Sequence, residues 1–323
     1  MKDNQSIYRS FCEKHPEIPL FLQAWWLDAV CTPENKKWDV WIYYEGNDIV
    51  ATMVFHTYKK LGFTFLTQPQ LTQHSGIWIN YPSNISTNRK YSLEKRICDF
   101  FIGQIEQAHI HYYQQCWHYK QTNWLPFYWH HFTQTTRYTY RIENISDTEK
   151  VFQNFNDSKK KNIRRAAKTC SITYDIKPVD FYNFQCKQLA VKNQTNVLSK
   201  QLVTHVINES IRSNHGFLIG ANNEEGKLIA ALFIVYDQNS AYDLISAIDM
   251  EYQSTGASSL LVWEAIKKVS SLTKVFDFEG SMIESVEHSF RKFGAIQTPY
   301  HCITKEYSRL CSTLLKLKNK WSK

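Results

Sequence analysis

The chain has 323 residues, of which 43% are hydrophobic and 15% aromatic, so it can bury two cores of ordinary domain size. Its net charge of +8 is moderate and unevenly spread, and its eight cysteines show no C-x-x-C spacing. No apolar run approaches the roughly 18 residues of a membrane-spanning helix, and the start lacks a signal-peptide pattern. These features exclude a disulfide-rich secreted protein and predict a cytoplasmic chain with reduced, mostly buried thiols.

The first half of the chain alternates between helix and strand patterns. The spacing of apolar residues predicts helices at 20–31 and 92–107. β-rich runs on both sides of a short Gly-containing turn predict a hairpin at 38–56. Further strands are predicted at 62–67, 109–116 and 137–142. The aromatic segment 122–132 is expected to lie between the two halves.

The second half repeats this order of elements. Two helices are expected before a meander of strands at 216–220, 227–236 and 241–248. A loop at 249–256, a helix at 257–269 and a strand at 274–278 follow. A second helix comes next and ends at Gly294. The helices exclude an all-β sandwich, and the antiparallel meander excludes a doubly wound sheet. The predicted fold class is α+β, with mixed, mostly antiparallel sheets flanked by helices.

Positive charge is most concentrated in SKKKNIRRAAK, residues 158–168, which reads as a helix. Its cations include Lys161, Arg164 and Arg165. The segment is either a solvated basic face or a surface that attracts a phosphate-bearing partner, such as a coenzyme, a nucleotide-linked precursor or tRNA. The sequence leaves both readings open.

The loop YQSTGASS, residues 252–259, lies between the last meander strand and a helix. Small residues let the backbone N–H groups of such a loop point inward, and a helix N-terminus adds about half a positive charge. The pattern is typical of a pyrophosphate cradle, although an ordinary loop with a Ser or Thr cap would look similar.

This order of meander, QSTGAS loop, helix, strand and helix resembles the acyl-CoA-binding core of the GNAT superfamily of N-acyltransferases. The basic helix and the strand end FDFEGS are similar to the FemABX-like branch, which has two GNAT-like domains in one chain. The resemblance implies an N-terminal GNAT-like domain at 1–136 and a C-terminal one at 137–323. The second domain would bind the acyl donor, and the first would shape the acceptor site.

The resemblance assigns the phosphates of acyl-CoA or acetyl-CoA to one stretch of backbone in the second domain: Gln253, Ser254, Thr255, Gly256, Ala257 and Ser258. The family pattern ends in Gly or Ala, so Ser258 is a departure. The first half offers only QHSGIW, in which Trp78 would obstruct a phosphate. We therefore expect no coenzyme in the first domain.

Two acids stand at the end of the strand in FDFEGSMIESVEHSFRKFGA, residues 276–295. Ser281 and Glu284 fit a capping box for the following helix, which explains them structurally. Asp277 and Glu279 would share one face of the strand. They point either toward the cationic helix 158–168, as an ion pair, or into a cleft, as bases.

Amide formation from a thioester or an aminoacyl ester needs little beyond a base for the proton of the attacking amine and a backbone donor for the oxyanion. Glu279 is the leading candidate for this base, and Asp277 and Tyr242 are weaker ones. Lys161, Arg164 and Arg165 are candidates for binding the substrate's phosphates. The histidine pairs at 109/111 and 130/131 lack a third ligand, so no metal is predicted.

The preferred function is transfer of an acyl group from acyl-CoA to an amine acceptor by direct attack. The acceptor would be a small molecule or a cell-wall precursor. One alternative is a FemABX-like peptidyltransferase that uses aminoacyl-tRNA and acts on a cell-wall precursor. Another, of a different class, is a non-catalytic module that binds nucleic acid or a precursor.

Overall fold

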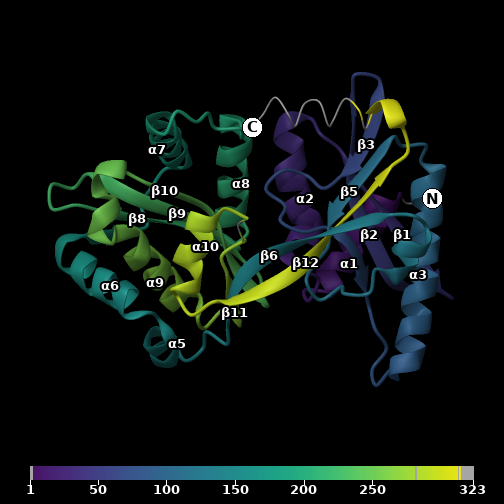
Figure 1. Ribbon diagram of the computed structural model, residues 1–323, viewed down its shortest axis with the longest axis horizontal. Coiled ribbons are helices and arrows are strands. Elements are labelled where there is room, and N and C mark those ends of the chain that lie inside the picture. Colours follow the sequence, from purple (N-terminus) through teal and green to yellow (C-terminus); the bar gives the residue numbers. More distant parts are fainter. Residues whose placement is uncertain (1–2, 281, 312, 314–323) are drawn as a thin grey trace. The chain divides into compact units, whose positions relative to one another are not determined.

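The computed structural model describes residues 3–280, 282–311 and 313, and the chain divides into two compact units (Figure 1). Unit 1 holds the described residues up to Arg137 and those from Pro299, and unit 2 is Tyr138–Thr298. The sequence-based boundary after residue 136 lies beside the first of these divisions. The C-terminal end differs, because the chain returns to unit 1 along a strand that the sequence analysis does not predict.

Unit 1 begins with helical segments, continues with a run of four strands, and then alternates between helix and strand. Its helical segments are α1 (Asn4–Lys14), η1 (Leu20–Leu22), α2 (Ala24–Cys31), η2 (Thr32–Glu34), α3 (Thr87–Gln107) and α4 (Leu125–Trp129). Its strands are β1 (Trp38–Glu45), β2 (Asp48–Lys60), β3 (Phe63–Thr67), β4 (Gly76–Ile79) and β5 (Tyr112–Cys116). Two further strands are shared between the units, and unit 1 holds residues 133–137 of β6 (Thr133–Glu143) and residues 299–306 of β12 (Ile296–Glu306). The predicted hairpin, the strand at 62–67 and the long helix are confirmed.

The sheet of unit 1 has the strand order β1-β2-β3-β5-β12, with β4 paired to β2. β3 and β5 run parallel, whereas β1, β2, β4 and β12 join antiparallel pairs. The apolar stripe of α3 packs on this sheet, with Ile97, Phe101 and Ile105 fully buried. Helical spacing in the sequence therefore identified the face that forms this core.

The aromatic segment 122–132 is part of the core of unit 1, not a connection between the halves. Phe127 of α4 lies 4.8 Å from Trp117 and 4.8 Å from Phe132, measured between ring centroids. All three side chains are buried. The expected position of this segment is wrong because Phe127 and Phe132 are buried in the core of unit 1, whereas Tyr128 and Trp129 are exposed.

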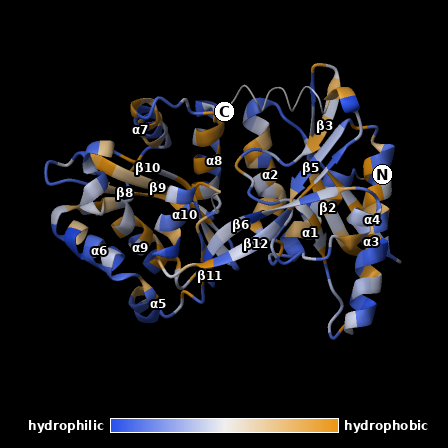
Figure 2. Ribbon diagram, in the orientation of Figure 1, coloured by the Kyte–Doolittle hydropathy of each residue, from blue (hydrophilic) through white to orange (hydrophobic). Residues whose placement is uncertain are grey.

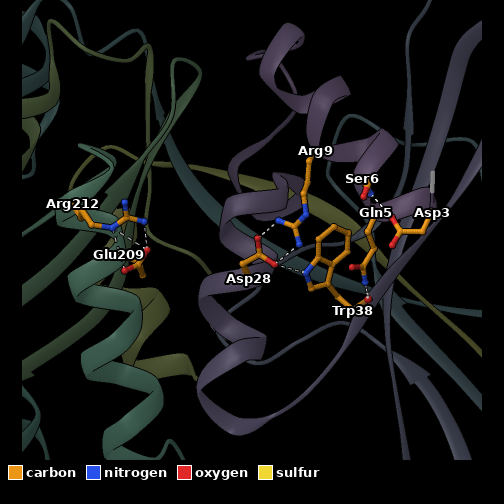
Figure 3. Close-up of polar contacts among 8 residues, drawn as sticks. All are labelled: Asp3, Gln5, Ser6, Arg9, Asp28, Trp38, Glu209 and Arg212. Carbon is orange, nitrogen blue, oxygen red and sulfur yellow. Dashed lines mark hydrogen bonds and ion pairs between the residues drawn. The ribbon is translucent and has the colours of Figure 1, made fainter. Parts of the chain in front are cut away.

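The helix α1 is held in unit 1 by a polar cluster (Figure 3). Arg9 forms a bidentate pair with Asp28 of α2, and one of its two contacts measures 2.8 Å. The indole nitrogen of Trp38 donates to the same carboxylate over 2.9 Å. Asp3 caps the helix by accepting from the backbone N–H of Ser6. These bonds connect α1, α2 and β1.

Unit 2 is built around the meander. Its helical segments are α5 (Thr148–Asn154), α6 (Asp157–Thr169), α7 (Pro178–Val191), α8 (Lys200–Arg212), η3 (Met250–Thr255), α9 (Ala257–Val269) and α10 (Glu284–Arg291). Its strands are β7 (Ser171–Thr173), β8 (Gly216–Asn222), β9 (Leu228–Tyr236), β10 (Ser240–Ile248) and β11 (Val275–Asp277), together with residues 138–143 of β6 and 296–298 of β12. The meander, α9 and β11 match the sequence prediction, whereas α5 to α8 precede the meander instead of two helices.

The sheet of unit 2 has the order β6-β11-β10-β9-β8-β7. β10 and β11 run parallel, and the pairs formed by β7, β8, β9 and β10 are antiparallel. Ala230, Leu232 and Ile234 of β9 pack in one cluster with α9, while Phe233 and Val235 are buried on the opposite face. α7 and α8 cover that opposite face (Figure 1). Both faces of the meander are therefore buried, as in a three-layer arrangement.

Within the described ranges, no helix combines the length and the apolar content that crossing a bilayer requires. The eight cysteines all lie in these ranges, and none is in a disulfide. Six of them are buried, as the sequence analysis predicts.

Candidate functional site

The parallel strands β10 and β11 pair over a short distance and then separate. Their register covers three residue pairs and ends at Tyr242–Asp277. β11 ends at that point, but β10 continues to Ile248. A register shift against β9, starting at Asp243, places an irregularity at the same level. The edge of β10 beyond Tyr242 therefore has backbone groups that β11 does not cover and that a ligand can bond.

Asp277 is 1% exposed at the end of β11. Its Oδ1 accepts hydrogen bonds from the hydroxyl of Thr139 and, over 2.8 Å, from the backbone N–H of Glu279. Its Oδ2 lies 3.8 Å from Nε of Arg141. Because Thr139 and Arg141 both belong to β6, Asp277 does not form the ion pair with the basic helix that was one of the two readings left open by the sequence. The carboxylate joins β6 to the turn after β11.

Glu279 lies just outside β11, and its φ of 60° shows that the strand has ended. Its side chain is half-buried. Burial raises the pKa of its carboxyl well above the usual range, and the nearby carboxylates of Asp277 and Asp243 raise it further. Glu279 therefore binds its proton more tightly than a solvent-exposed glutamate does.

Asp243 is the third acid of this group, and the sequence analysis did not select it. Within the described residues, its buried Oδ1 has no hydrogen-bond partner. Burial raises the pKa of this carboxyl to about 7. Asp243 looks in sequence like an outward-facing polar residue of a meander strand, so only the position of β10 inside the sheet reveals it.

Tyr242, a further candidate base, is 1% exposed and paired with Asp277 across the two strands. Ser281 lies outside the described residues. Glu284 is the first residue of α10, and Ile283 occupies the N-cap, so Glu284 is not in the third helical position that a capping box needs.

The predicted cradle forms the end of η3 and the first turn of α9. Gln253 and Ser254 are exposed, whereas Ala257 is buried and Ser258 half-buried. The backbone N–H of Ala257 donates to Oγ1 of Thr255 over 3.2 Å. The N–H groups of the following first turn have no partner inside a helix, so this end can bind an anion.

Gly256 contacts the basic helix α6, not only the loop. Its φ is 91°, and a Cβ at this position would lie 2.5 Å from the carbonyl oxygen of Asn162. Arg165 of α6 donates to the carbonyl oxygens of Ser254 and Thr255, the latter at 3.1 Å. The small residue is therefore required for packing against α6, and any larger side chain at Gly256 would disturb the fold.

Lys159 is the residue of α6 that approaches the first turn of α9 most directly, and sequence reasoning did not distinguish it from its neighbours. Its Nζ donates to Ser289 of α10 over 2.9 Å and lies 3.4 Å from Oγ of Ser259. The ammonium also lies 4.2 Å from the centroid of the Phe293 ring. Burial, with a smaller contribution from Lys292, lowers its pKa to about 8.

Four other cations of α6 are exposed and Lys160 is half-buried, and Figure 2 shows this helix as largely hydrophilic. The guanidinium of Arg164 lies 5.7 Å from the Phe152 ring centroid. Arg165 is engaged with the loop, and Lys161 is an exposed residue of the same helix. Within the described residues, no three His, Cys, Asp or Glu side chains are grouped so that they could hold a metal ion.

The sequence matches no known protein family and no curated protein. The structure, in contrast, is similar to solved structures over nearly its whole length. FemX gives a TM-score of 0.69 at 9% identity, over 93% of this chain and 96% of that one. A tandem GNAT protein from the clavulanic acid biosynthesis pathway gives 0.55 at 8% identity, over 94% of each chain. L-PGS from Bacillus licheniformis gives 0.54 at 9% identity, over 91% of each chain.

These likenesses show the fold. The chain has a GNAT-type, FemABX-like fold, which confirms the predicted α+β class with two tandem GNAT-like domains. Chains with this fold differ in what they do, so the activity has to be argued from the site.

Proposed function

We propose that the chain transfers an acyl group from acyl-CoA, such as acetyl-CoA, to an amine by direct attack. The observation that carries this proposal is Asp243, a half-buried acid whose Oδ1 is enclosed and whose pKa is about 7, where β10 and β11 separate. A general base works best when its pKa is close to the working pH. A buried carboxyl tuned in this way is typical of a functional site.

The reaction needs one proton acceptor and a fixed geometry. The amine nitrogen attacks the thioester carbon, and the amine proton passes to the Asp243 carboxylate. The carbon–sulfur bond then breaks, and the thiolate leaves and takes up a proton. Backbone N–H groups on the free edge of β10 can stabilise the oxyanion, because they are fixed before the reaction begins.

Two features of unit 2 support a phosphate-bearing donor. The first turn of α9 presents N–H groups, and Lys159 places an ammonium beside Ser259 in that turn. The solved tandem GNAT protein is described as a form without AcCoA, which associates this fold with that coenzyme. The acceptor-shaping role of residues 1–136 stays a prediction.

Asp243 and Glu279 are proposed to have different roles. The pKa of Asp243, about 7, is close to the working pH, whereas the pKa of Glu279 is raised by burial and by the neighbouring carboxylates of Asp277 and Asp243, so Asp243 is the preferred base. We expect Asp243→Asn to lower the rate by about 10²–10⁴. Glu279→Gln, which keeps a neutral group of the same size, should lose less. The reverse order of effects would restore Glu279 as the base.

The experiment follows release of free thiol from acetyl-CoA with a panel of amines that includes amino sugars and amino-acid amides. Asp175→Asn, an exposed acid in the same unit, is the matched control and should keep the wild-type rate. Thermal melting of each variant shows whether it is folded. A folded Asp243→Asn variant with the wild-type rate would remove Asp243 from the mechanism.

A second candidate is transfer from aminoacyl-tRNA, favoured by the likeness to FemX and by the exposed basic face of α6. In that case aminoacyl-tRNA, and not acetyl-CoA, would support amide formation. Strongly salt-dependent RNA binding without transfer from either donor would instead indicate the non-catalytic module.

A further inference from the structure

Cys116 of β5 and Cys302 of β12 face each other in unit 1. They are partners in the antiparallel register of the two strands. The adjoining pair is hydrogen-bonded, because the backbone N–H of Trp117 donates to the carbonyl of His301 over 2.7 Å. Hydrogen-bonded and non-hydrogen-bonded pairs alternate, so the two cysteines form a non-hydrogen-bonded pair, with Cα atoms about 4.5 Å apart. That spacing lies within the range of roughly 4.4–6.8 Å found across disulfides.

The two thiols share a hydrogen bond, and the surroundings favour a thiolate on one of them. The bond from Cys116 is the main influence that lowers the pKa of Cys302, and the Arg137 guanidinium lowers it further. The same bond, together with burial, raises the pKa of Cys116. The Arg137 guanidinium therefore favours Cys302 as the thiolate that attacks first.

The pair is buried, and two of the side chains that interact with Cys302 are exposed. Cys116 is 6% exposed and Cys302 is 2% exposed. Arg137 and Thr135, which both interact with the sulfur of Cys302, are themselves exposed. The backbone of Cys116 is held on both sides, since its N–H donates to Gln68 and its carbonyl accepts from Ser75. Movement of exposed side chains, without rearrangement of the strands, would therefore open the sulfurs to a reagent.

We propose that Cys116 and Cys302 form a redox modification site that a low-molecular-weight disulfide of the glutathione type oxidises to an intramolecular disulfide. The Cys302 thiolate attacks one sulfur of the reagent and releases one thiolate. Cys116 then loses its proton to solvent and attacks the Cys302 sulfur of the mixed disulfide, which releases the second thiolate. Two protein thiols are oxidised by two electrons, and the reagent is reduced to two thiols.

The resulting bond would fasten β12 to β5 and close a long loop of chain. A cross-link across a long loop restricts the unfolded chain strongly, so the oxidised protein should melt at a higher temperature than the reduced one. This inference is independent of the proposed acyl transfer, because it concerns residues of unit 1 alone.

The test equilibrates the full chain with mixtures of oxidised and reduced glutathione, blocks remaining thiols with an alkylating reagent, and maps the peptides without reduction. We expect a Cys116–Cys302 cross-linked peptide whose fraction rises with the proportion of oxidised glutathione and which dithiothreitol removes. Cys116→Ser should stop at a mixed disulfide on Cys302. Cys302→Ser, or Cys302→Val if the serine variant fails to fold, should show neither product.

Cys186→Ser is the matched control, because Cys186 is half-buried and in the other unit, and this variant should form the cross-link as the wild type does. The proposal is overturned if both cysteines of the wild type remain fully alkylated at every glutathione ratio. It is also overturned if Cys116 and Cys302 carry separate glutathione groups instead of a bond to each other.

Discussion

Asp243 illustrates how a single residue can carry more information in the structure than in the sequence. A carboxyl taken out of water without a hydrogen-bond partner costs free energy, and the group responds by keeping its proton to higher pH. Asp277 and Glu279 were selected from sequence because two acids close together at a strand end are conspicuous. One acid within a meander strand is not.

The folded-state pKa of about 7 at Asp243 predicts a pH dependence of stability. Between about pH 4 and pH 7 the folded chain binds a proton that the unfolded chain has released, so the free energy of unfolding falls as the pH rises through this range. Asp243→Asn cannot ionise and should lose this slope, so its stability relative to the wild type should rise by roughly 2–3 kcal/mol from pH 5 to pH 8. Urea unfolding of both proteins at pH 5 and pH 8 measures it. Equal slopes would mean that Asp243 ionises normally.

Lys159 predicts a pH dependence of donor binding. Its pKa of about 8 means that the ammonium is lost as the pH rises above that value, so the affinity for acetyl-CoA should fall between pH 7 and pH 9. Lys159→Met should weaken binding at pH 7 about tenfold or more, as expected for a charge-assisted hydrogen bond, and flatten the pH profile. Isothermal titration measures both effects. Lys168→Met, at an exposed position of the same helix that is not a candidate for phosphate binding, is the control and should change the affinity little.

At the scale of elements, the junction of α6 with the first turn of α9 is the feature that a loop motif alone does not reveal. QSTGAS suggests a backbone that curls around a phosphate. In the structure, however, glycine is required at position 256 because the backbone of α6 leaves no room for a side chain there. Motifs report local conformation well. They do not show which helix, distant in sequence, packs on the same residues. The loop motif therefore does not single out Lys159.

The close approach at Gly256 predicts a large cost for adding a methyl group. Gly256→Ala should lower the free energy of unfolding by about 2–4 kcal/mol, from the contact with Asn162 and the positive φ together. Gly226→Ala is the matched control: its φ is +78°, but nothing lies within 4 Å of the added Cβ. It should cost about 1 kcal/mol. Equal losses in urea unfolding would show that packing against α6 does not matter.

Elements with strong periodicity were predictable, and elements with weak periodicity were not. The meander strands and α9 have long apolar patterns that favour one structure. α1 buries only Tyr8 and Cys12, so its sequence has too few apolar positions to identify a helix. β12 contains Pro299 and has an irregular burial pattern, and it becomes a strand by pairing with β5.

At the scale of the whole molecule, the sequence predicted two GNAT-like domains, and the likeness to FemX and to the tandem GNAT protein confirms that fold. The return of β12 to unit 1 was not predictable, because it depends on a pairing between strands that are distant in sequence. The fold likewise does not identify the donor, because proteins that share one fold can differ in function. Only direct binding separates acyl-CoA from aminoacyl-tRNA.

Isothermal titration of the full chain with acetyl-CoA tests the central claim most directly. The titration is done first without and then with aminoacyl-tRNA as competitor. We predict saturable binding of one acetyl-CoA per chain, which Lys159→Met weakens, Lys168→Met leaves nearly unchanged and tRNA does not displace. An absence of saturable acetyl-CoA binding, together with tight aminoacyl-tRNA binding that weakens steeply with salt, would contradict the proposed donor.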